Sequence, residues 1–189
     1  MATDYEGLGT PGIHPYLVGA SEGRGVLDVA RAAQALRAAH ASDRVVVDGH
    51  SQGGHAALFA GEIAAKYAPD LHLLGISAGA PVTDVAAFLD SSRVLDGFKG
   101  FPVLAAAGYH AVYPHAPLDA LFSAEAVETA KYVRHACALG DSVTAYIYAN
   151  ADHSSVLSAA RTDVEHWIAA RFAGRPTRGC KTVHRSSAT

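Results

Sequence analysis

Cysteine is scarce in this chain, and so are the residue spacings that bind metal ions. Cys137 and Cys180 are the only two cysteines in 189 residues, too few for a four-cysteine zinc site and too far apart for a Cys-x-x-Cys redox pair. They leave two alternatives, one disulfide or two buried thiols. The 11 histidines form neither His-x-x-x-His nor His-Glu-x-x-His, the spacings typical of zinc sites. We therefore expect no metal ion and no cofactor.

Clustered charge and long apolar runs are also missing. The formal net charge is −3, and the 15 Lys and Arg residues are scattered along the chain, which excludes the basic footprint of a nucleic-acid-binding protein and favours a neutral substrate. No apolar run approaches the ~20 residues that a transmembrane helix needs. Met1 is followed by Ala-Thr-Asp-Tyr-Glu, so we expect no signal peptide in this chain.

The residues that are present predict one domain of alternating helices and strands. An apolar content of 50% with 17% charged residues is typical of a globular protein. Amphipathic and buried patterns predict a helix, a strand, a second helix and a second strand, at residues 21–40, 44–48, 54–68 and 71–76. This alternation predicts a short, mostly parallel sheet flanked by helices, which is an α/β fold.

The rest of the chain is less regular. Residues 84–136 are mostly helical in pattern but broken by glycine and proline, and residues 101–107 fit a helix or a strand equally well. A strand at 143–148 and a helix at about 155–173 follow. We expect residues 1–174 to form the core domain and residues 175–189 to form a flexible, polar tail.

A candidate nucleophile lies between the first predicted strand and the second predicted helix. The motif Gly49-His50-Ser51-Gln52-Gly53 is a weak signal alone, but its strand-turn-helix context is that of a nucleophile elbow. An ordinary turn or a phosphate-binding loop is the alternative. The phosphate loop is disfavoured because no lysine follows the glycines of this motif and their spacing is not that of Gly-x-Gly-x-x-Gly.

A serine nucleophile needs a general base, and His153 has the position expected for one. It follows the strand at 143–148 and precedes the last helix, which is where this kind of fold carries its catalytic histidine. A histidine that only caps a loop is the alternative. His50 is next to Ser51 in the chain, and we expect its ring to point away from the serine hydroxyl.

Several segments together resemble the secretory lipase family of the lipase A type, which belongs to the α/β-hydrolases. They are Asp4–Gly7, Gly19–Ala33, Gly49–Ala56, Tyr67–Leu71, Asn150–His153 and Trp167–Phe172. The similarity covers about residues 1–180. It implies a secreted lipase or esterase that hydrolyses acylglycerols and other carboxylic esters.

The resemblance also implies roles for further residues. Asp4 matches the aspartate of the family's oxyanion loop, and Gln52 would supply the second oxyanion donor through its backbone N–H. Residues 84–136 resemble part of the family's helical cap over the acyl-binding site. Cys137 and Cys180 resemble positions that can form a disulfide in secreted members.

This chain departs from the family pattern in two places. The family has three further strands before the segment that corresponds to Asp4–Gly7, and this chain starts almost at that segment. The strand that carries the catalytic aspartate, together with most of the cap, is missing before the Cys137–Gly140 stretch. We therefore expect an abridged α/β-hydrolase fold with a remnant of the cap.

The missing aspartate makes the catalytic acid an open question. Asp84 follows the strand at 71–76 on the catalytic edge and is the best substitute, although a carboxylate in the first turn of a helix at 84–90 is an equal alternative. Asp141 precedes its strand and so lies roughly 20 Å from the catalytic edge. Asp152 is adjacent to His153 and poorly placed to reach its ring, and Asp119 is in a segment that the pattern does not place.

Two functions of different classes remain. The first is a carboxylic ester hydrolase with Ser51 as nucleophile and His153 as base, in which loss of the acid would lower kcat by ~10⁴. The second is a catalytically silent fragment that acts as a binding or assembly module. A sheet without its first strands exposes an edge, which favours a homo-oligomer through edge pairing.

Overall fold

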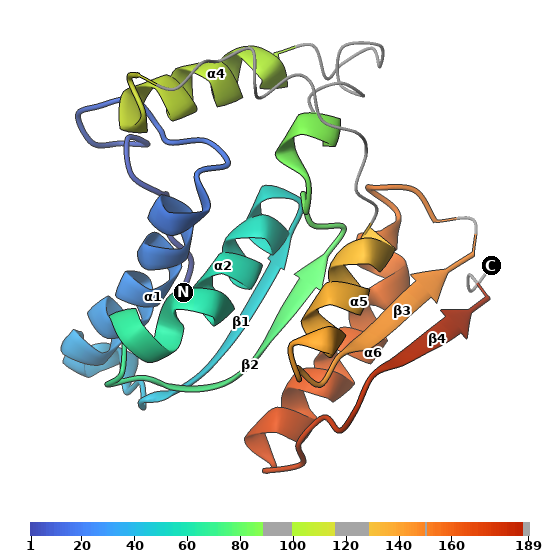
Figure 1. Ribbon diagram of the computed structural model, residues 1–189. Helices are drawn as coiled ribbons and strands as arrows, with labels where there is room; N and C mark the ends of the chain where they lie inside the picture. The colour runs from blue at the N-terminus through green and yellow to red at the C-terminus, as the bar shows by residue number, and fades with distance from the viewer. Residues whose placement is uncertain (89–99, 116–128, 150, 187–189) are drawn as a thin grey trace.

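The computed structural model describes residues 1–88, 100–115, 129–149 and 151–186, and it contains two parallel pairs of strands (Figure 1). Strand β1 (Arg44–His50) pairs with β2 (His72–Gly79), and β3 (Thr144–Tyr148) pairs with β4 (Lys181–Arg185). Short parallel sheets with flanking helices confirm the predicted α/β class.

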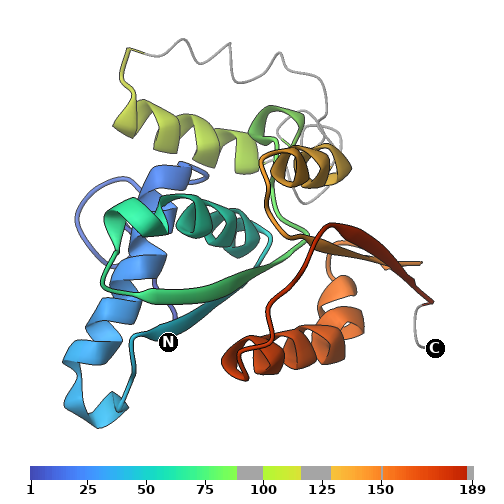
Figure 2. The same ribbon diagram turned by 60° about the horizontal axis from the view of Figure 1, so that its bottom comes forward.

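Helices cover both faces of the β1–β2 pair (Figure 2). Helices α1 (Gly19–Ala35) and α2 (Gln52–Tyr67) lie on one face, and α6 (Val156–Phe172) lies on the other. Helix α2 contacts both strands, and α6 contacts them from the opposite side. The helix after β1 and the helix after β3 therefore both start at the carboxyl ends of strands, where an α/β sheet carries its functional residues.

Small residues let α1 and α2 approach closely. A Cβ atom added at Gly19 would lie 2.3 Å from the Phe59 ring, and one at Gly23 would lie 3.0 Å from the backbone nitrogen of Ala60. Beneath this contact is an apolar cluster of Leu27, Ala60, Ala64, Ala68 and Leu71. The close contact fixes the N-terminal half of α1 beside the middle of α2.

Helix α4 (Phe101–Val112) lies across the end of the molecule at which β1 and β2 finish (Figure 1). This settles residues 101–107 as helix. Ala105 packs with Tyr16, Leu17 and Val82 in a second apolar cluster. The hydroxyl of Tyr109 also donates to the carbonyl oxygen of Leu17 at 3.0 Å, so α4 is held on the loop that precedes α1.

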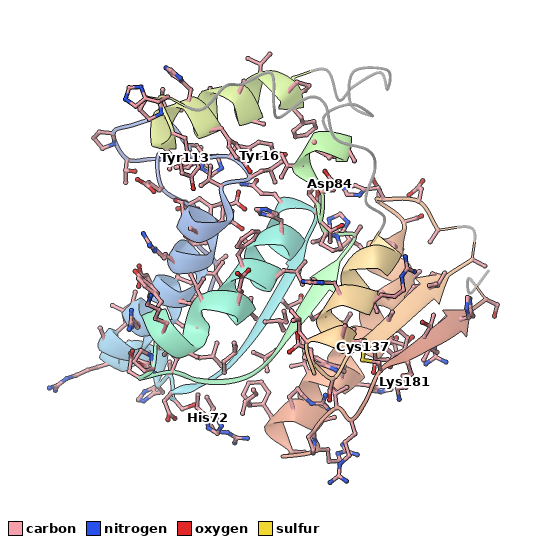
Figure 3. All side chains as sticks on the ribbon, in the orientation of Figure 1. Tyr16, His72, Asp84, Tyr113, Cys137 and Lys181 are labelled. Atoms are coloured by element: carbon pink, nitrogen blue, oxygen red, sulfur yellow. A yellow bond between two sulfur atoms is a disulfide. The ribbon has the colours of Figure 1, made fainter. Side chains whose placement is uncertain are left out.

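Residues 181–185 correct the expectation of a flexible tail from residue 175, because they form β4. Helix α5 (Thr129–Ala138) carries Cys137, which is bonded to Cys180 just before β4 (Figure 3). Arg185 at the other end of β4 pairs with Asp163 of α6 at 2.8 Å. A strand of polar composition is thus held at both ends by contacts that its own sequence does not reveal.

Candidate active site

Ser51 occupies the turn between β1 and α2 in a strained conformation. Its φ is 58° and its ψ is −118°, a region that non-glycine residues rarely adopt and that is typical of a nucleophile elbow. Its backbone N–H donates to the carbonyl oxygen of Gly79 at 2.9 Å. The β2 end therefore holds the turn in place.

The elbow is possible because strand and helix meet through glycines. A Cβ atom at Gly49 would lie 2.1 Å from the carbonyl oxygen of Gly53, and one at Gly54 would lie 2.9 Å from that of Gly79. These are contacts with backbone atoms, which cannot rotate away. Glycine at positions 49 and 54 thus has a direct steric cause, whereas a Cβ atom at Gly53 would meet only the Tyr5 hydroxyl at 4.0 Å.

His153 lies beside the serine hydroxyl, as predicted. Its Nε2 atom is 3.0 Å from Oγ of Ser51, although the two residues are 102 positions apart in the chain. His153 lies on the turn between β3 and α6. With Nε2 unprotonated, the hydroxyl donates to the ring, which is the arrangement that general-base activation of a serine requires.

The surroundings of His153 favour the unprotonated ring. Burial is the largest cause that lowers its pKa, and the nearby His50 lowers it further, while Asp152 acts in the opposite direction. A lowered pKa keeps the imidazole neutral, and so able to accept a proton, over a wider range of pH.

His50 has a role that sequence reasoning missed. Its Nε2 lies 2.8 Å from the carbonyl oxygen of His153, and the two ring centroids are 4.7 Å apart. A carbonyl oxygen only accepts, so Nε2 of His50 is the donor. The residue before the nucleophile therefore holds the backbone of the base, a contact for which adjacency to Ser51 was the only sequence signal.

Asp152 is engaged by the loop that carries His153. One of its carboxylate oxygens accepts from the backbone N–H groups of Ser154 and Ser155 and from the Ser155 hydroxyl, at 3.0, 2.7 and 2.8 Å. The bonds from Ser155 and Ser154 lower the pKa of Asp152. This carboxylate stabilises the turn before α6.

Asp84, the predicted substitute acid, follows the carboxyl end of β2 (Figure 3). Its Oδ1 accepts from the backbone N–H of Ala87 at 2.9 Å, at the start of the helical residues 85–88. That bond matches the alternative of a carboxylate in a first helical turn. The role of Asp84 as the catalytic acid stays a prediction. Asp119 lies outside the described residues.

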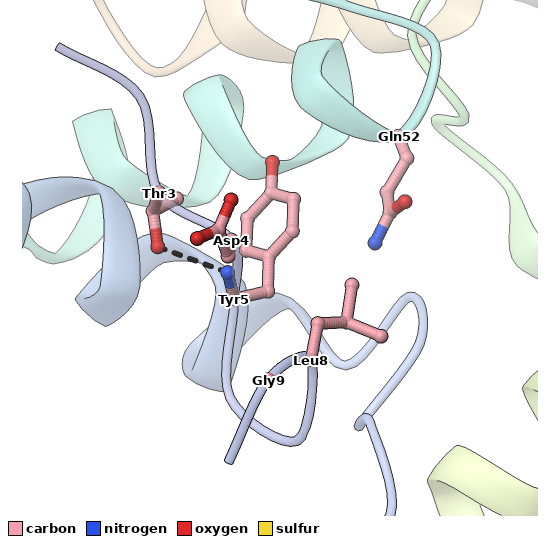
Figure 4. A pocket seen from close by; sticks show the side chains of 6 residues that line it. All are labelled: Thr3, Asp4, Tyr5, Leu8, Gly9 and Gln52. Carbon is pink, nitrogen blue, oxygen red and sulfur yellow. Dashed lines mark hydrogen bonds between the residues drawn. The ribbon is translucent and has the colours of Figure 1, made fainter.

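Asp4 and Gln52 line the same open hollow (Figure 4). Its volume is about 470 Å³, and the residues around it are Thr3, Asp4, Tyr5, Leu8, Gly9 and Gln52. Tyr5 has a φ of 61°, and its N–H donates to the Thr3 hydroxyl at 3.0 Å. The N-terminal segment and the first residue of α2 thus meet at this hollow, and the oxyanion roles of Asp4 and Gln52 stay a prediction.

A buried carboxylate lies behind Gln52, and sequence reasoning did not single it out. Glu22 of α1 is 1% exposed, and Nε2 of Gln52 donates to its Oε1 at 2.7 Å. Nδ1 of His55, itself 4% exposed, lies 2.7 Å from the other carboxylate oxygen. Glutamate is rarely buried this fully unless it is paired, and in an amphipathic helix that also carries Asp28 no sequence signal marks Glu22 as the buried acid.

In the part of the chain that the structure describes, no three His, Cys, Asp or Glu side chains gather as a metal site would require. Within the same residues, no helix combines the length and the apolar character of a membrane span.

The proteins to which the chain is similar include a named lipase and two solved structures. It is 29% identical over 139 residues to Lipase A of Moesziomyces aphidis, a match that covers 71% of this chain but only 28% of that protein. Candida antarctica lipase A in its closed state aligns with 88% of this chain and 57% of its own, at 19% identity and a TM-score of 0.61.

The second structure is the rice cell wall degrading esterase LipA from Xanthomonas oryzae. It aligns with 98% of this chain and 64% of its own, at 20% identity and a TM-score of 0.53. The chain therefore has the fold of these α/β-hydrolases but spans less than two thirds of their length. Residues 1–156 match the sequence profile of the secretory lipases, and the chain belongs to this family.

Proposed function

We propose that this chain is a carboxylic ester hydrolase in which Ser51 is the nucleophile and His153 the general base. The observation that carries the proposal is the 3.0 Å distance between Oγ of Ser51 and Nε2 of His153. It is joined to the strained elbow, which presents the hydroxyl at the carboxyl end of β1. The names of the similar proteins, a lipase and an esterase, support an ester as substrate.

The reaction would follow the acyl-enzyme route. His153 takes the proton of the Ser51 hydroxyl while Oγ bonds to the ester carbonyl carbon, and the carbonyl oxygen becomes an oxyanion. When the intermediate collapses, the bond to the alkoxy oxygen breaks, and His153 returns the proton to the leaving alcohol. Water, deprotonated by the same ring, then releases the carboxylic acid and regenerates Ser51.

The oxyanion would be stabilised where α2 begins. The backbone N–H of Gln52 is at the N-terminus of α2, where the helix dipole also favours negative charge. The backbone N–H of Asp4 would complete the oxyanion hole from the other side of the shared hollow. One such donor is worth about 10² to 10³ in kcat.

We propose that Asp84 is the catalytic acid that supports His153. How well it does so determines kcat. A histidine without a correctly placed carboxylate loses ~10⁴ in kcat but retains turnover above background. Because Asp84 is engaged with Ala87, we expect weak turnover in this chain.

The substrate class and the site of action follow from the same proposal. The small net charge favours a neutral ester, and α4 would be the remnant of a cap over the acyl group. We place the protein outside the cell, because its family is described as secretory. The Cys137–Cys180 disulfide fits an oxidising compartment.

The deciding experiment combines a fluorophosphonate probe with hydrolysis of short and long p-nitrophenyl esters. The wild type should be labelled and should release p-nitrophenol, and Ser51→Ala and His153→Ala should do neither above background. Ser158→Ala and His166→Ala, both at exposed positions of α6, are the matched controls. Undiminished labelling of Ser51→Ala would show that another residue is the nucleophile.

A further inference from the structure

The carboxylate of Glu22 is a junction between three segments around the active site. Oε1 accepts from the backbone N–H of Leu17 at 3.0 Å and from Nε2 of Gln52 at 2.7 Å. Oε2 faces Nδ1 of His55 at 2.7 Å. A carboxylate that is 1% exposed is costly to bury unless such donors replace its water. Helix packing alone therefore does not explain why α1 carries a glutamate at this buried position.

Gln52 extends this junction toward the N-terminal segment. Its amide nitrogen donates to Glu22 and also lies 2.8 Å from Nε2 of His14. Both amide hydrogens are then used, and Nε2 of His14 must be the acceptor. Nδ1 of His14 is left as the donor, and it lies 2.9 Å from the carbonyl oxygen of Glu6.

The result is a continuous hydrogen-bonded chain from α1 to the segment Asp4–Gly7. It runs from Glu22 through Gln52 and His14 to the backbone of Glu6. The same carboxylate of Glu22 also accepts from the backbone N–H of Leu17. It thereby holds a leucine whose φ of 58° is unfavourable for this residue type. This chain joins the two elements proposed to bind the oxyanion: Gln52, in its middle, is the first residue of α2, and Glu6, at its end, belongs to the Asp4–Gly7 segment.

We propose that Glu22 is a positioning residue that holds the Asp4–Gly7 segment against the start of α2 through Gln52 and His14. It thereby sets the distance between Asp4 and the backbone N–H of Gln52, the two groups proposed to bind the oxyanion. The catalytic consequence rests on the proposed ester hydrolysis, whereas the mechanical link does not. Oxyanion donors act only when they are correctly placed before the reaction, so loosening the link lowers kcat and leaves KM nearly unchanged.

Hydrogen exchange tests the link without relying on activity. Gln52→Met keeps the backbone N–H but removes the amide, and His14→Phe keeps a ring between Tyr5 and Tyr16 but removes the acceptor. Each variant should raise the deuterium uptake rate of residues 3–9 by about tenfold. The reason is that both variants remove the hydrogen bond between Gln52 and His14, which opposes local opening of the N-terminal segment. Unchanged uptake in both variants overturns the proposal, even if Ser51 hydrolyses esters.

Matched controls separate the link from general loosening. Gln34→Met makes the same chemical change at a half-buried position of α1, where the amide donates only to the carbonyl oxygen of Ser42 at 3.1 Å. His110→Phe makes it at an exposed position of α4. Both should leave the uptake of residues 3–9 at the wild-type rate. An equal rise in the controls would overturn the assignment. Glu22→Gln should raise uptake less than Glu22→Leu, since glutamine retains an acceptor oxygen for Gln52 and Leu17.

Kinetics then test the consequence for catalysis. Gln52→Met and His14→Phe should each lower kcat for a p-nitrophenyl ester about tenfold, a fraction of the value of one oxyanion donor, with KM within twofold. The double variant should be no slower than the slower single variant, because both break one chain of contacts. Independent, multiplying losses would overturn the proposal. If the wild type itself neither reacts nor is labelled, the proposed function fails, and exchange still decides the link.

Discussion

His50 donates a hydrogen bond to the backbone carbonyl oxygen of His153, with 2.8 Å between Nε2 and the oxygen. The residue before the nucleophile therefore anchors the loop that carries the base, and its ring lies 4.7 Å from that of the base. Two residues 103 positions apart in the chain are joined at the point where the serine proton would move.

This contact predicts a shift in the pH dependence of ester hydrolysis. His153 acts as a base only when unprotonated, so kcat/KM falls as pH drops through its pKa, which burial and His50 lower. His50→Phe removes one of the lowering causes while keeping a ring of similar size. The pKa of His153 should rise, and the acid limb of the profile should move to higher pH. A pH series of initial rates measures this.

His72→Phe is the control for that series, because His72 is exposed and lies at the opposite end of the β1–β2 pair. Its profile should superimpose on that of the wild type. An acid limb that stays in place in His50→Phe would contradict the role assigned to His50.

The steric argument for the elbow predicts that Gly49→Ala is strongly destabilising. The added Cβ would lie 2.1 Å from the Gly53 carbonyl oxygen, so β1 and α2 must separate at a cost of roughly 3 kcal/mol. For a domain of this size, that lowers Tm by about 6 to 12 °C. Gly100→Ala, where no described residue beyond the chain neighbours comes within 4 Å of the added Cβ, should keep Tm within about 1 °C in the same thermal scan.

The Cys137–Cys180 disulfide predicts a large effect of reduction on stability. It closes a loop of 43 residues, which corresponds to about 4 kcal/mol of loop entropy in the unfolded chain. A reducing agent should therefore lower the Tm of the wild type by about 8 to 16 °C. The variant with serine at both positions should have the lower Tm from the outset and no response to the reductant. Equal Tm values with and without reductant in the wild type would contradict a formed bond.

The edge of β1 predicts self-association. Among the described residues, β1 pairs with β2 and with no other strand, so its second edge presents unpaired backbone groups that favour pairing with another chain. Size-exclusion chromatography with light scattering should show a dimer whose fraction rises with protein concentration. A monomer at every concentration would rule out edge pairing.

The buried strands and the elbow were predictable because their causes are local. The run Val45–Val47 has the β-branched composition of a covered strand, and β1 extends it to His50. The glycines of the elbow fit because strand and helix meet within a few residues. By contrast, β4 was missed because its polar sequence pairs with β3 only through a register that joins Thr144 to Lys181 and Tyr148 to Arg185.

The sequence alone determined the class of fold and pointed to Ser51 and His153 as the proposed nucleophile and base, since each follows from local chemistry or from chain order within a known family. Only the tertiary structure decided which side chains support them. Glu22 is 30 positions from Gln52, and His50 is 103 from His153. Burial and hydrogen bonding between such distant residues depend on how α1, β1 and the loop before α6 pack together, and no local pattern encodes that packing.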